Sequence, residues 1–585
     1  MQHAGMDGYM EARVAPMPKR TWSSIRRRVS RERLHRMMVA RLPELWSHHS
    51  SLIVLGIITG VGGGLFAVAF RWLIRVFHSV FFDGGAIAFA ALGPYYTVLL
   101  PALGGLIVGP LTVFFAPEAR GHGVPEIMQA VTEQRGKIRP RVAIVKSIAS
   151  SICIGSGGSV GREGPIAQIG AALGSVLGIT LHLPEKRIKT LVACGAGAGI
   201  AATFNAPVGG AFFALELILR EWSAEAFAPV VIASVVAATI GRMVFGDVPA
   251  FQMPTHHFSG FTELPYLILL GVIAGPVAAL FTRSISLSET VGDRVPVPRW
   301  ALPIVGGLLV GFVGLYDPTL YGVGYEKIQS LLTEPHNLLW PLMALIPIKL
   351  LAVSLTLGSG GSGGVFSPSL YIGALVGFVF GAFANAHFPG VTTEPSVYAL
   401  LGMAAVFAGT AHAPITAVLI VFELIADYHM LLPLMVVVGT SVITARFVYR
   451  FSVYNVKLVS RGVHVQLEHD IRVLSEISVE ETMYEDIYTV SCDAPVTEVM
   501  AAFDETRHHG FPVVDDGGEL HGIVTMGDVR RAGPDTRDLT ASDIATHRLI
   551  IAFPDDSLND ALRKMGMAGV GRLPVVDPDD HSHLL

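Results

Sequence analysis

The stretch GSGGSVGREGP, residues 155–165, places an arginine and a glutamate next to each other among glycines. Long apolar runs flank this stretch on both sides. An ionisable residue within a membrane-spanning region is costly to bury and is therefore a functional candidate by default. Glu163, with its neighbour Arg162, is the first candidate for chemistry in this chain. A structural ion pair between the two side chains is the simpler alternative.

The composition indicates what surrounds this pair. Of the 585 residues, 51% are hydrophobic and only 15% are charged, whereas soluble domains carry roughly 25% charged residues. Between about residues 51 and 449 apolar runs dominate, and several reach the length of about 20 residues that a helix needs to cross a bilayer. Others are short or interrupted by glycine and proline. We predict a polytopic helical membrane protein, with the lipid bilayer as its surroundings.

The two ends of the chain differ from this apolar region. Residues 1–50 are rich in arginine and poor in acids. This composition favours a cytoplasmic segment in contact with anionic lipid headgroups of the membrane over a nucleic-acid-binding segment. This segment leads into a first span without a cleavage pattern, so we expect no signal peptide. From about residue 470 the chain becomes polar. We expect both termini in the cytoplasm and a location in the inner or plasma membrane of the cell.

An internal repeat runs through the apolar region. Residues 155–174, GSGGSVGREGPIAQIGAALG, align without a gap with residues 358–377, GSGGSGGVFSPSLYIGALVG. Further on, NAPVGGAFFALELI at 205–218 matches HAPITAVLIVFELI at 412–425. Two matches in the same order indicate a duplicated half. Such repeats are typical of transporters, often with one half inverted and with the binding site near the middle of the membrane.

The glycines of the first repeat predict helices that begin within the membrane. Non-helical backbone at that depth is tolerated where protein buries it or where it lines a wet cavity. A helix that begins there presents free N–H groups and the positive end of its dipole, and both attract anions. Pro165 and Pro368 suit the first turn of such helices. The alternative is that the glycines only permit close helix packing.

Four segments carry a family resemblance: GREGP at 161–165, GVFSP at 364–368, GHGVPE at 121–126 and SVYNVKL at 452–458. They resemble the signature segments of the CLC family of chloride channels and transporters, in the family's order along the chain. The resemblance implies an all-α polytopic membrane domain, here expected at 51–460, built as an inverted repeat of tilted and broken helices. It also implies a homodimer with one anion pathway in each subunit.

The resemblance assigns roles to single residues. Glu163 matches the gating glutamate, whose carboxylate competes with the anion and swings away when it is protonated. Tyr454 matches the tyrosine whose hydroxyl donates to the central anion, with an aromatic anchor at the membrane surface as the alternative. His122 stands where the family usually has serine, so its effect on the choice of anion stays open. The other positions assigned to anion binding are Gly123, Val124, Arg162, Gly164, Val365 and Phe366.

Proton coupling depends on a further position. Proton-coupled members generally carry an inward-facing glutamate directly after the position that matches Glu216, and this chain has Leu217 there. Leucine cannot relay a proton. Glu216 has a repeat partner in Glu423, which favours a structural role shared by the two. We therefore predict passive conduction of chloride or a similar small anion, of the voltage-gated channel type, with a chloride/proton antiporter as the alternative. An unrelated inverted-repeat transporter for a cation or an organic substrate is the second alternative.

The polar tail, residues 470–585, resembles a pair of CBS domains with an α/β fold. The first copy covers about residues 483–533 and includes the segment GIVTMGD. The second copy, about 540–585, stops before its own matching strand and helix. CBS pairs often bind adenine nucleotides, and the resemblance points to Thr525 and Asp528 as ribose contacts. Because only one such pair of residues is present, a structural or dimer-stabilising tail is favoured and no cofactor is required.

Nothing in the sequence favours an enzyme or a metal protein. No Walker lysine motif, nucleophile elbow or HExxH occurs. Gly195, Gly197 and Gly199 are spaced somewhat like a dinucleotide fingerprint but follow no strand and lack its βαβ context, so we interpret them as part of the apolar repeat. The three cysteines show no metal-ligand spacing, and we expect free thiols.

Overall fold

The computed structural model describes residues 49–220, 222–247, 251, 260–336, 338–463, 474, 477–484, 487–506, 508–533, 536 and 538–585. The basic segment expected at 1–50 lies outside these residues except at its C-terminal end. The chain divides into two compact units, Met1–Val463 and His464–Leu585.

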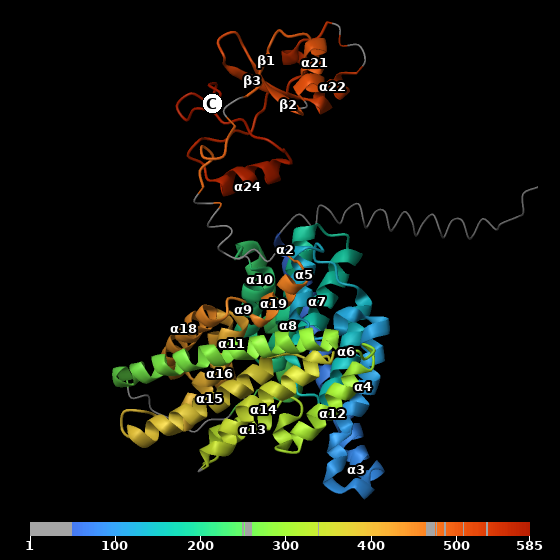
Figure 1. The fold of residues 1–585 in the computed structure, drawn as a ribbon, viewed down its shortest axis with the longest axis vertical. Coiled ribbons are helices and arrows are strands. Elements are labelled where there is room, and N and C mark those ends of the chain that lie inside the picture. The colour runs from blue at the N-terminus through green and yellow to red at the C-terminus, as the bar shows by residue number, and fades with distance from the viewer. Residues whose placement is uncertain are drawn as a thin grey trace, which may run out of the picture. The chain divides into compact units, whose positions relative to one another are not determined.

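The first unit is a bundle of helices that cross at many different angles (Figure 1). Its N-terminal half contains α2 (His49–His78), η1 (Ser79–Asp83), α3 (Gly84–Ala88), η2 (Ala90–Val98), α4 (Leu100–Pro110), η3 (Leu111–Phe115), η4 (Pro117–Ala119), α5 (Val124–Thr132), α6 (Pro140–Gly155), α7 (Glu163–Thr180), α8 (Glu185–Phe204), α9 (Pro207–Phe213), η5 (Ala214–Leu219) and α10 (Ala224–Phe245). Its C-terminal half contains η6 (Gly260–Glu263), α11 (Leu264–Arg294), α12 (Leu302–Gly314), η7 (Pro318–Leu320), α13 (Tyr325–Thr333), α14 (Leu339–Gly358), α15 (Phe366–His387), α16 (Pro395–Ala411), α17 (Pro414–Ile425), η8 (Tyr428–Met430), α18 (Leu431–Val448) and α19 (Val453–Ser460).

The lengths of these helices vary as the interrupted apolar runs predict. Within the described residues, six helices are long and apolar enough to cross a membrane. A seventh span results if Ala90–Val98 and Leu100–Phe115, bent by 57° at their junction, are counted as one. Other apolar helices have only 10–17 residues, fewer than the about 20 that a straight crossing needs. The unit therefore combines complete spans with incomplete ones.

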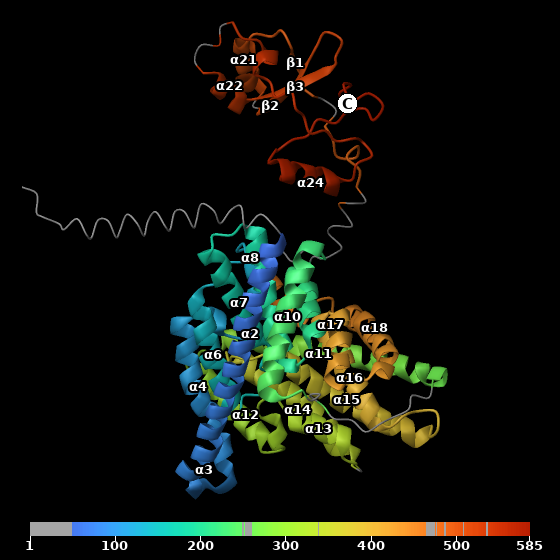
Figure 2. The same cartoon turned by 180° about the vertical axis from the view of Figure 1, so that it is seen from behind.

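The duplicated half is visible in the packing. In the N-terminal half α2 and α8 both pack against α10, and α7 packs along α8. In the C-terminal half α11 and α16 pack against α18 in the same way, and α15 packs along α16. Figure 2 shows α2 beside α10 on the near side of the unit. The halves meet where α4 packs on α12 and α9 on α17, so these contacts join each helix to its repeat counterpart.

Glycines inside the repeated helices serve close packing. A Cβ atom placed on Gly170 of α7 would collide with the Gly195 carbonyl of α8, and one on Gly373 of α15 would collide with the Gly402 carbonyl of α16. Small residues let membrane helices approach to this degree. The packing alternative is therefore right for these glycines, and Gly195 is a buried residue of helix α8.

The second unit contains a small sheet covered by helices. Its strands are β1 (Val490–Ser491), β2 (Gly510–Val514) and β3 (Leu520–Thr525), in the order β1-β2-β3. β1 and β2 are parallel, and β2 and β3 are antiparallel. The helices are α21 (Val496–Thr506), α22 (Met526–Ala532), α23 (Ala541–Ile544) and α24 (Leu558–Ala568). Inward-facing residues alternate along β2, and they bring Phe511 and Val513 into the core. Phe503 of α21 packs against them from the helix side.

Candidate anion site

Three helices begin next to one another in the interior of the first unit. α5 begins at Val124, α7 at Glu163 and α15 at Phe366, each directly after a glycine-rich segment. All three residues are buried. The first turn of a helix has N–H groups without intrahelical partners and carries the positive end of the helix dipole. Three such starts from the two halves of the repeat favour a negative charge between them.

Backbone hydrogen bonds hold the glycine-rich segments together. Gly161 donates to the carbonyl of Gly364 at 2.7 Å, and Gly364 donates back at 2.6 Å. Gly121 donates to the carbonyl of Gly361 at 3.0 Å. These bonds link the segment before α15 to the segments before α7 and α5. The glycine-rich segments before α5, α7 and α15 thus meet at one place, which we call the junction, and do not form separate loops.

The junction surrounds a small pocket. Seven of the nine lining residues are positions that the sequence assigned to the anion site, and Ile200 of α8 and Phe213 of α9 complete the wall. Neither of these two carries a sequence signal, because an apolar residue in an apolar helix looks the same in a core and in a pocket wall. The lining consists of His122, Val124, Glu163, Gly164, Ile200, Phe213, Val365, Phe366 and Tyr454.

Two glycines are required where the backbones approach. Gly123, which precedes α5, has a φ of +86°, in the region that favours glycine. A Cβ atom on Gly164 would collide with the carbonyl oxygen of His122. Both positions were assigned to anion binding, and the structure shows that they allow the starts of α5 and α7 to touch.

The Glu163 side chain is fully buried. Its Oε1 accepts a hydrogen bond of 2.8 Å from the Tyr325 hydroxyl. Its Oε2 is buried and has no hydrogen-bond partner among the described residues. The Nε atom of Arg162 lies 3.8 Å from Oε1, which is too long for a hydrogen bond. The ion pair with Arg162 therefore exists, but within the described part of the chain it leaves Oε2 without a hydrogen-bond partner.

His122 is also buried at the pocket, with 1% of its surface exposed. Its Nδ1 atom has no hydrogen-bond partner within the part of the chain that the structure describes. The centre of its ring lies 5.9 Å from that of Tyr454. A buried polar atom without a partner is costly, and no described residue offsets this cost for the nitrogen.

Tyr454 lies on the short helix α19 and is 2% exposed. This burial does not fit an aromatic anchor at the membrane surface, the alternative for this residue. One turn further on, Lys457 of α19 forms ion pairs with Glu126 of α5 at 3.3 Å and with Glu289 of α11 at 3.6 Å. These ion pairs hold α19 against the helix that begins at the pocket, so they position the Tyr454 ring.

Glu216 and Glu423 have the shared structural role that their repeat spacing predicts. Glu216 of η5 accepts hydrogen bonds from the backbone N–H groups of Ile415 and Thr416 at the start of α17. Glu423 of α17 accepts the same kind of bonds from the start of α9. Each half of the repeat thus caps a helix of the other half. Leu217, beside Glu216, is 4% exposed and has no titratable atom.

In the second unit, Thr525 and Asp528 form a capping box at the start of α22. One oxygen of Asp528 accepts from the Thr525 N–H at 2.8 Å and from its hydroxyl at 2.5 Å, and Arg531 pairs with the other oxygen. Burial alone raises the pKa of Asp528, but the Thr525 hydrogen bonds and Arg531 outweigh burial and lower it. These polar groups are satisfied within the helix start, so the pair offers a nucleotide no unpartnered carboxylate.

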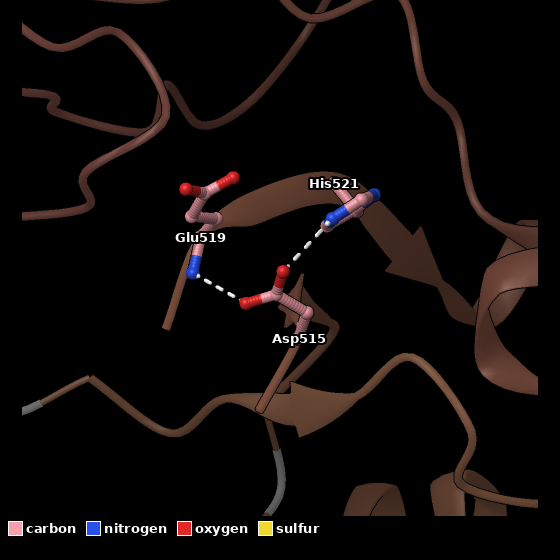
Figure 3. A group of neighbouring side chains, drawn as sticks. All are labelled: Asp515, Glu519 and His521. Carbon is pink, nitrogen blue, oxygen red and sulfur yellow. Dashed lines mark hydrogen bonds and ion pairs between the residues drawn. The ribbon is translucent and has the colours of Figure 1, made fainter. Parts of the chain in front are cut away.

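A second polar group of the tail lies at the turn from β2 to β3, with His521 on β3 itself (Figure 3). Asp515, Glu519 and His521 each offer one atom within 4.8 Å of the others. One oxygen of Asp515 accepts hydrogen bonds of 2.9 Å from the N–H groups of Gly517 and Glu519, and the other lies 3.4 Å from the His521 ring. These bonds stabilise the turn, and we assign no ligand to the group.

A duplicated helical membrane unit with helix starts meeting at a buried pocket defines a membrane transport protein. The sequence pattern of the family described as "Voltage gated chloride channel" matches residues 104–446, and the CBS domain pattern matches 475–535 and 541–585. The chain belongs to this voltage-gated chloride channel family, the CLC family, and it carries a CBS pair after the membrane unit. The alternative of an unrelated transporter is therefore excluded.

Relatives with names in the same family cover most of the chain. The putative chloride channel protein ClcB-like of Ralstonia nicotianae is 34% identical over 412 residues, covering 69% of this chain and 95% of that protein. The chloride channel protein CLC-f of Arabidopsis thaliana is 28% identical over 618 residues, covering 91% of this chain and 78% of that protein. Two solved structures share the fold. A slow cyanobacterial Cl⁻/H⁺ antiporter has a TM-score of 0.65 at 26% identity, covering 71% of this chain and 98% of that chain. A eukaryotic CLC transporter has a TM-score of 0.63 at 20% identity, covering 91% of this chain and 97% of that chain.

Proposed function

We propose that the protein moves chloride or a similar small anion across the membrane through the pocket at the helix starts, and that Glu163 gates this path. The observation that carries the proposal is the buried Glu163 carboxylate, held at the start of α7 with Oε2 unpartnered among the described residues. A carboxylate at that place is a tethered anion and can occupy the position that a free anion would take. Neutralising or moving it opens the position.

The other lining residues receive complementary roles. Backbone N–H groups at the starts of α5, α7 and α15 stabilise the bound anion, and side chains matter little at these positions. The side-chain donors are the Tyr454 hydroxyl and Nδ1 of His122, which has no hydrogen-bond partner among the described residues. Arg162, directly before Glu163, adds a positive charge beside the site. The backbone positions are Gly123, Val124, Gly164, Val365 and Phe366.

We favour passive conduction, of the voltage-gated channel type, over proton exchange. Leu217 is buried and apolar where proton-coupled members generally have a glutamate, and the neighbouring Glu216 carboxylate is engaged by the start of α17. Without an inner titratable group, a proton would have to cross apolar protein as an unpaired charge. Exchange of chloride for protons is the second candidate, because a solved relative at 26% identity is a Cl⁻/H⁺ antiporter.

The remaining features of the proposal concern location and assembly. We place the membrane domain at 51–460 as a multi-pass protein of the inner or plasma membrane, acting as a homodimer with both termini in the cytoplasm. The CBS region at 470–585 then stabilises the dimer. The internal cap that Thr525 and Asp528 form supports a structural role for them over ribose contacts.

The test of the gating role is Glu163→Gln in reconstituted vesicles. Chloride efflux through the wild type should rise as external pH falls, because protonation releases the carboxylate. The variant should conduct at all pH values with a flat profile. Glu263→Gln is the control, since Glu263 is equally buried but binds Thr393 and Tyr398 away from the pocket lining. A variant that retains the wild-type pH profile would refute the assignment of Glu163.

A further inference from the structure

The residue that donates a hydrogen bond to the Glu163 side chain comes from a part of the chain that none of the motifs covers. Tyr325 is the first residue of α13, and its hydroxyl lies 2.8 Å from Glu163 Oε1 and 2.9 Å from the Ser367 hydroxyl. The Arg162 guanidinium lies 5.1 Å from the centre of the Tyr325 ring. Phe251 packs against the same ring edge-on at 5.6 Å. The ring is therefore clamped, and the hydroxyl has a defined position.

The directions of these hydrogen bonds follow from the chemistry of the groups. An ionised carboxylate can only accept, so the Tyr325 hydroxyl donates its single proton to Glu163. The Tyr325 oxygen then accepts from the Ser367 hydroxyl. Ser367 thus orients Tyr325, and Tyr325 binds Glu163. A hydrogen bond to an ionised group is stronger than one to a neutral group, so protonation of the carboxylate weakens this link.

The repeat explains how Tyr325 reaches this place. The segment GVGYEK at 322–327 has its two glycines spaced as in GHGVPE at 121–126. Gly324 is left-handed, with a φ of +79°, and precedes α13 as Gly123 precedes α5. Tyr325 therefore corresponds to Val124, which lines the pocket. Both halves begin a helix at this position; the first half places Val124 at the pocket, and the second half places a phenol hydroxyl beside Glu163.

We propose that Tyr325 is a positioning residue that holds the Glu163 carboxylate in its blocking position, and that Ser367 orients the Tyr325 hydroxyl. The proposal rests on the proposed gating role of Glu163. Loss of the hydroxyl removes one stabiliser of the ionised, blocking carboxylate. A free anion then displaces the carboxylate more easily, and a lower proton concentration suffices to release it.

Other charged and titratable groups face the carboxylate and remain when Tyr325 is changed. Arg162 lies directly before α7, Tyr454 on α19 and His122 before α5. Arg71 of α2 interacts electrostatically with both Arg162 and Tyr325. The Arg162 guanidinium stays 3.8 Å from the carboxylate, so a Tyr325 variant should stay gated by pH. The pH of half-maximal chloride efflux should shift in this variant, and the dependence of efflux on pH should remain.

The experiment measures chloride efflux from vesicles against external pH for Tyr325→Phe. We expect half-maximal efflux at a pH higher by about one unit, the equivalent of one charge-assisted hydrogen bond. Ser367→Ala should shift the midpoint in the same direction by less, because Tyr325 stays in place. Tyr371→Phe is the matched control, since its buried hydroxyl contacts Thr319 instead of Glu163, and its midpoint should equal that of the wild type.

A double variant separates this proposal from the gating proposal. In a Glu163→Gln background, Tyr325→Phe should change nothing further. If Glu163→Gln alone has a flat pH profile but Tyr325→Phe and Ser367→Ala behave like the wild type, the role of Tyr325 is wrong while that of Glu163 stands. If Glu163→Gln keeps the wild-type profile, the gating proposal itself fails. A Tyr325 effect that persists in the Glu163→Gln background also overturns the proposal.

Discussion

The reciprocal caps at the repeat interface predict a large effect on stability for Glu216→Ala. The Glu216 carboxylate accepts from the Ile415 N–H at 3.2 Å, the Thr416 N–H at 2.7 Å and the Thr416 hydroxyl at 2.5 Å. Its counterpart Glu423 accepts from Val208 at 3.0 Å and Gly209 at 2.7 Å. Removal of Glu216 leaves the start of α17 without its carboxylate cap at the contact between the two halves.

The size of the effect follows from these bonds. Loss of a helix cap costs about 0.5–2 kcal/mol, and each hydrogen bond to a charged group contributes about 1.5–3 kcal/mol. Ile415 is 42% exposed, so its N–H is the donor least dependent on Glu216. We therefore expect Glu216→Ala to lower the free energy of unfolding by roughly 2–4 kcal/mol, from the Thr416 donors and the lost cap. Glu216→Gln keeps an acceptor and should lose about half as much.

The assay is denaturation of the purified protein in detergent, with the midpoint compared between variants. Glu334→Ala is the control, because Glu334 is an exposed carboxylate bonded to Ser330 alone among the described residues. It should change stability by no more than about 0.5 kcal/mol. Chloride conduction per folded Glu216→Gln molecule should match the wild type. A Glu216→Ala variant as stable as Glu334→Ala would refute the capping role, and loss of conduction in folded Glu216→Gln would contradict a purely structural one.

Three further predictions follow from the site and the tail. His122→Ser should change the relative permeability of chloride and nitrate in vesicle flux assays, since His122 lines the pocket and its Nδ1 has no hydrogen-bond partner among the described residues; unchanged selectivity would place His122 off the path. Lys146→Met removes donors to the Ala119 and Gly121 carbonyls in the segment before α5. Because Ser362 and Gly363 still donate to these oxygens, we expect the variant to fold. The segment before α5 is then held by fewer bonds, so calorimetry should show weaker chloride binding, and unaltered affinity would contradict this. Asp528 has a folded pKa below its unfolded value of about 3.9, so its stabilisation of α22 is present above that pH and is lost as pH falls through the folded value. The amide hydrogen-exchange rate of α22 in full-length Asp528→Asn should thus exceed that of the wild type at neutral pH, and the difference between the two rates should decrease in acid. Equal exchange rates at pH 7 would refute the stabilising role of Asp528.

The sequence predicted those parts of the site that a repeat or a motif marks. Glu163, Gly164, Phe366 and Tyr454 meet at one pocket because their segments begin helices or lie on short ones. Ile200 could not be predicted, because tertiary packing alone decides whether an apolar residue faces a pocket. The same limit applies to Phe213 of α9.

Two other features had a signal that sequence reasoning did not use fully. Tyr325 follows a glycine pair with the spacing of the His122 segment, so the repeat could have identified it as a residue at the junction. The equal spacing of Glu216 and Glu423 from their prolines indicated a shared role. That each caps the other half's helix depends on how α9 and α17 pack, and the order of residues does not contain this information.

The most direct test of the central claim is the reversal potential of the reconstituted protein under crossed chloride and pH gradients. Passive anion conduction through the pocket predicts a potential set by the chloride gradient alone, unchanged when the pH gradient is reversed. Leu217, buried and without a titratable atom, is the structural reason for this expectation. A potential that shifts with the pH gradient, together with uphill proton movement driven by chloride and abolished in Glu163→Ala, would contradict it and establish exchange of chloride for protons.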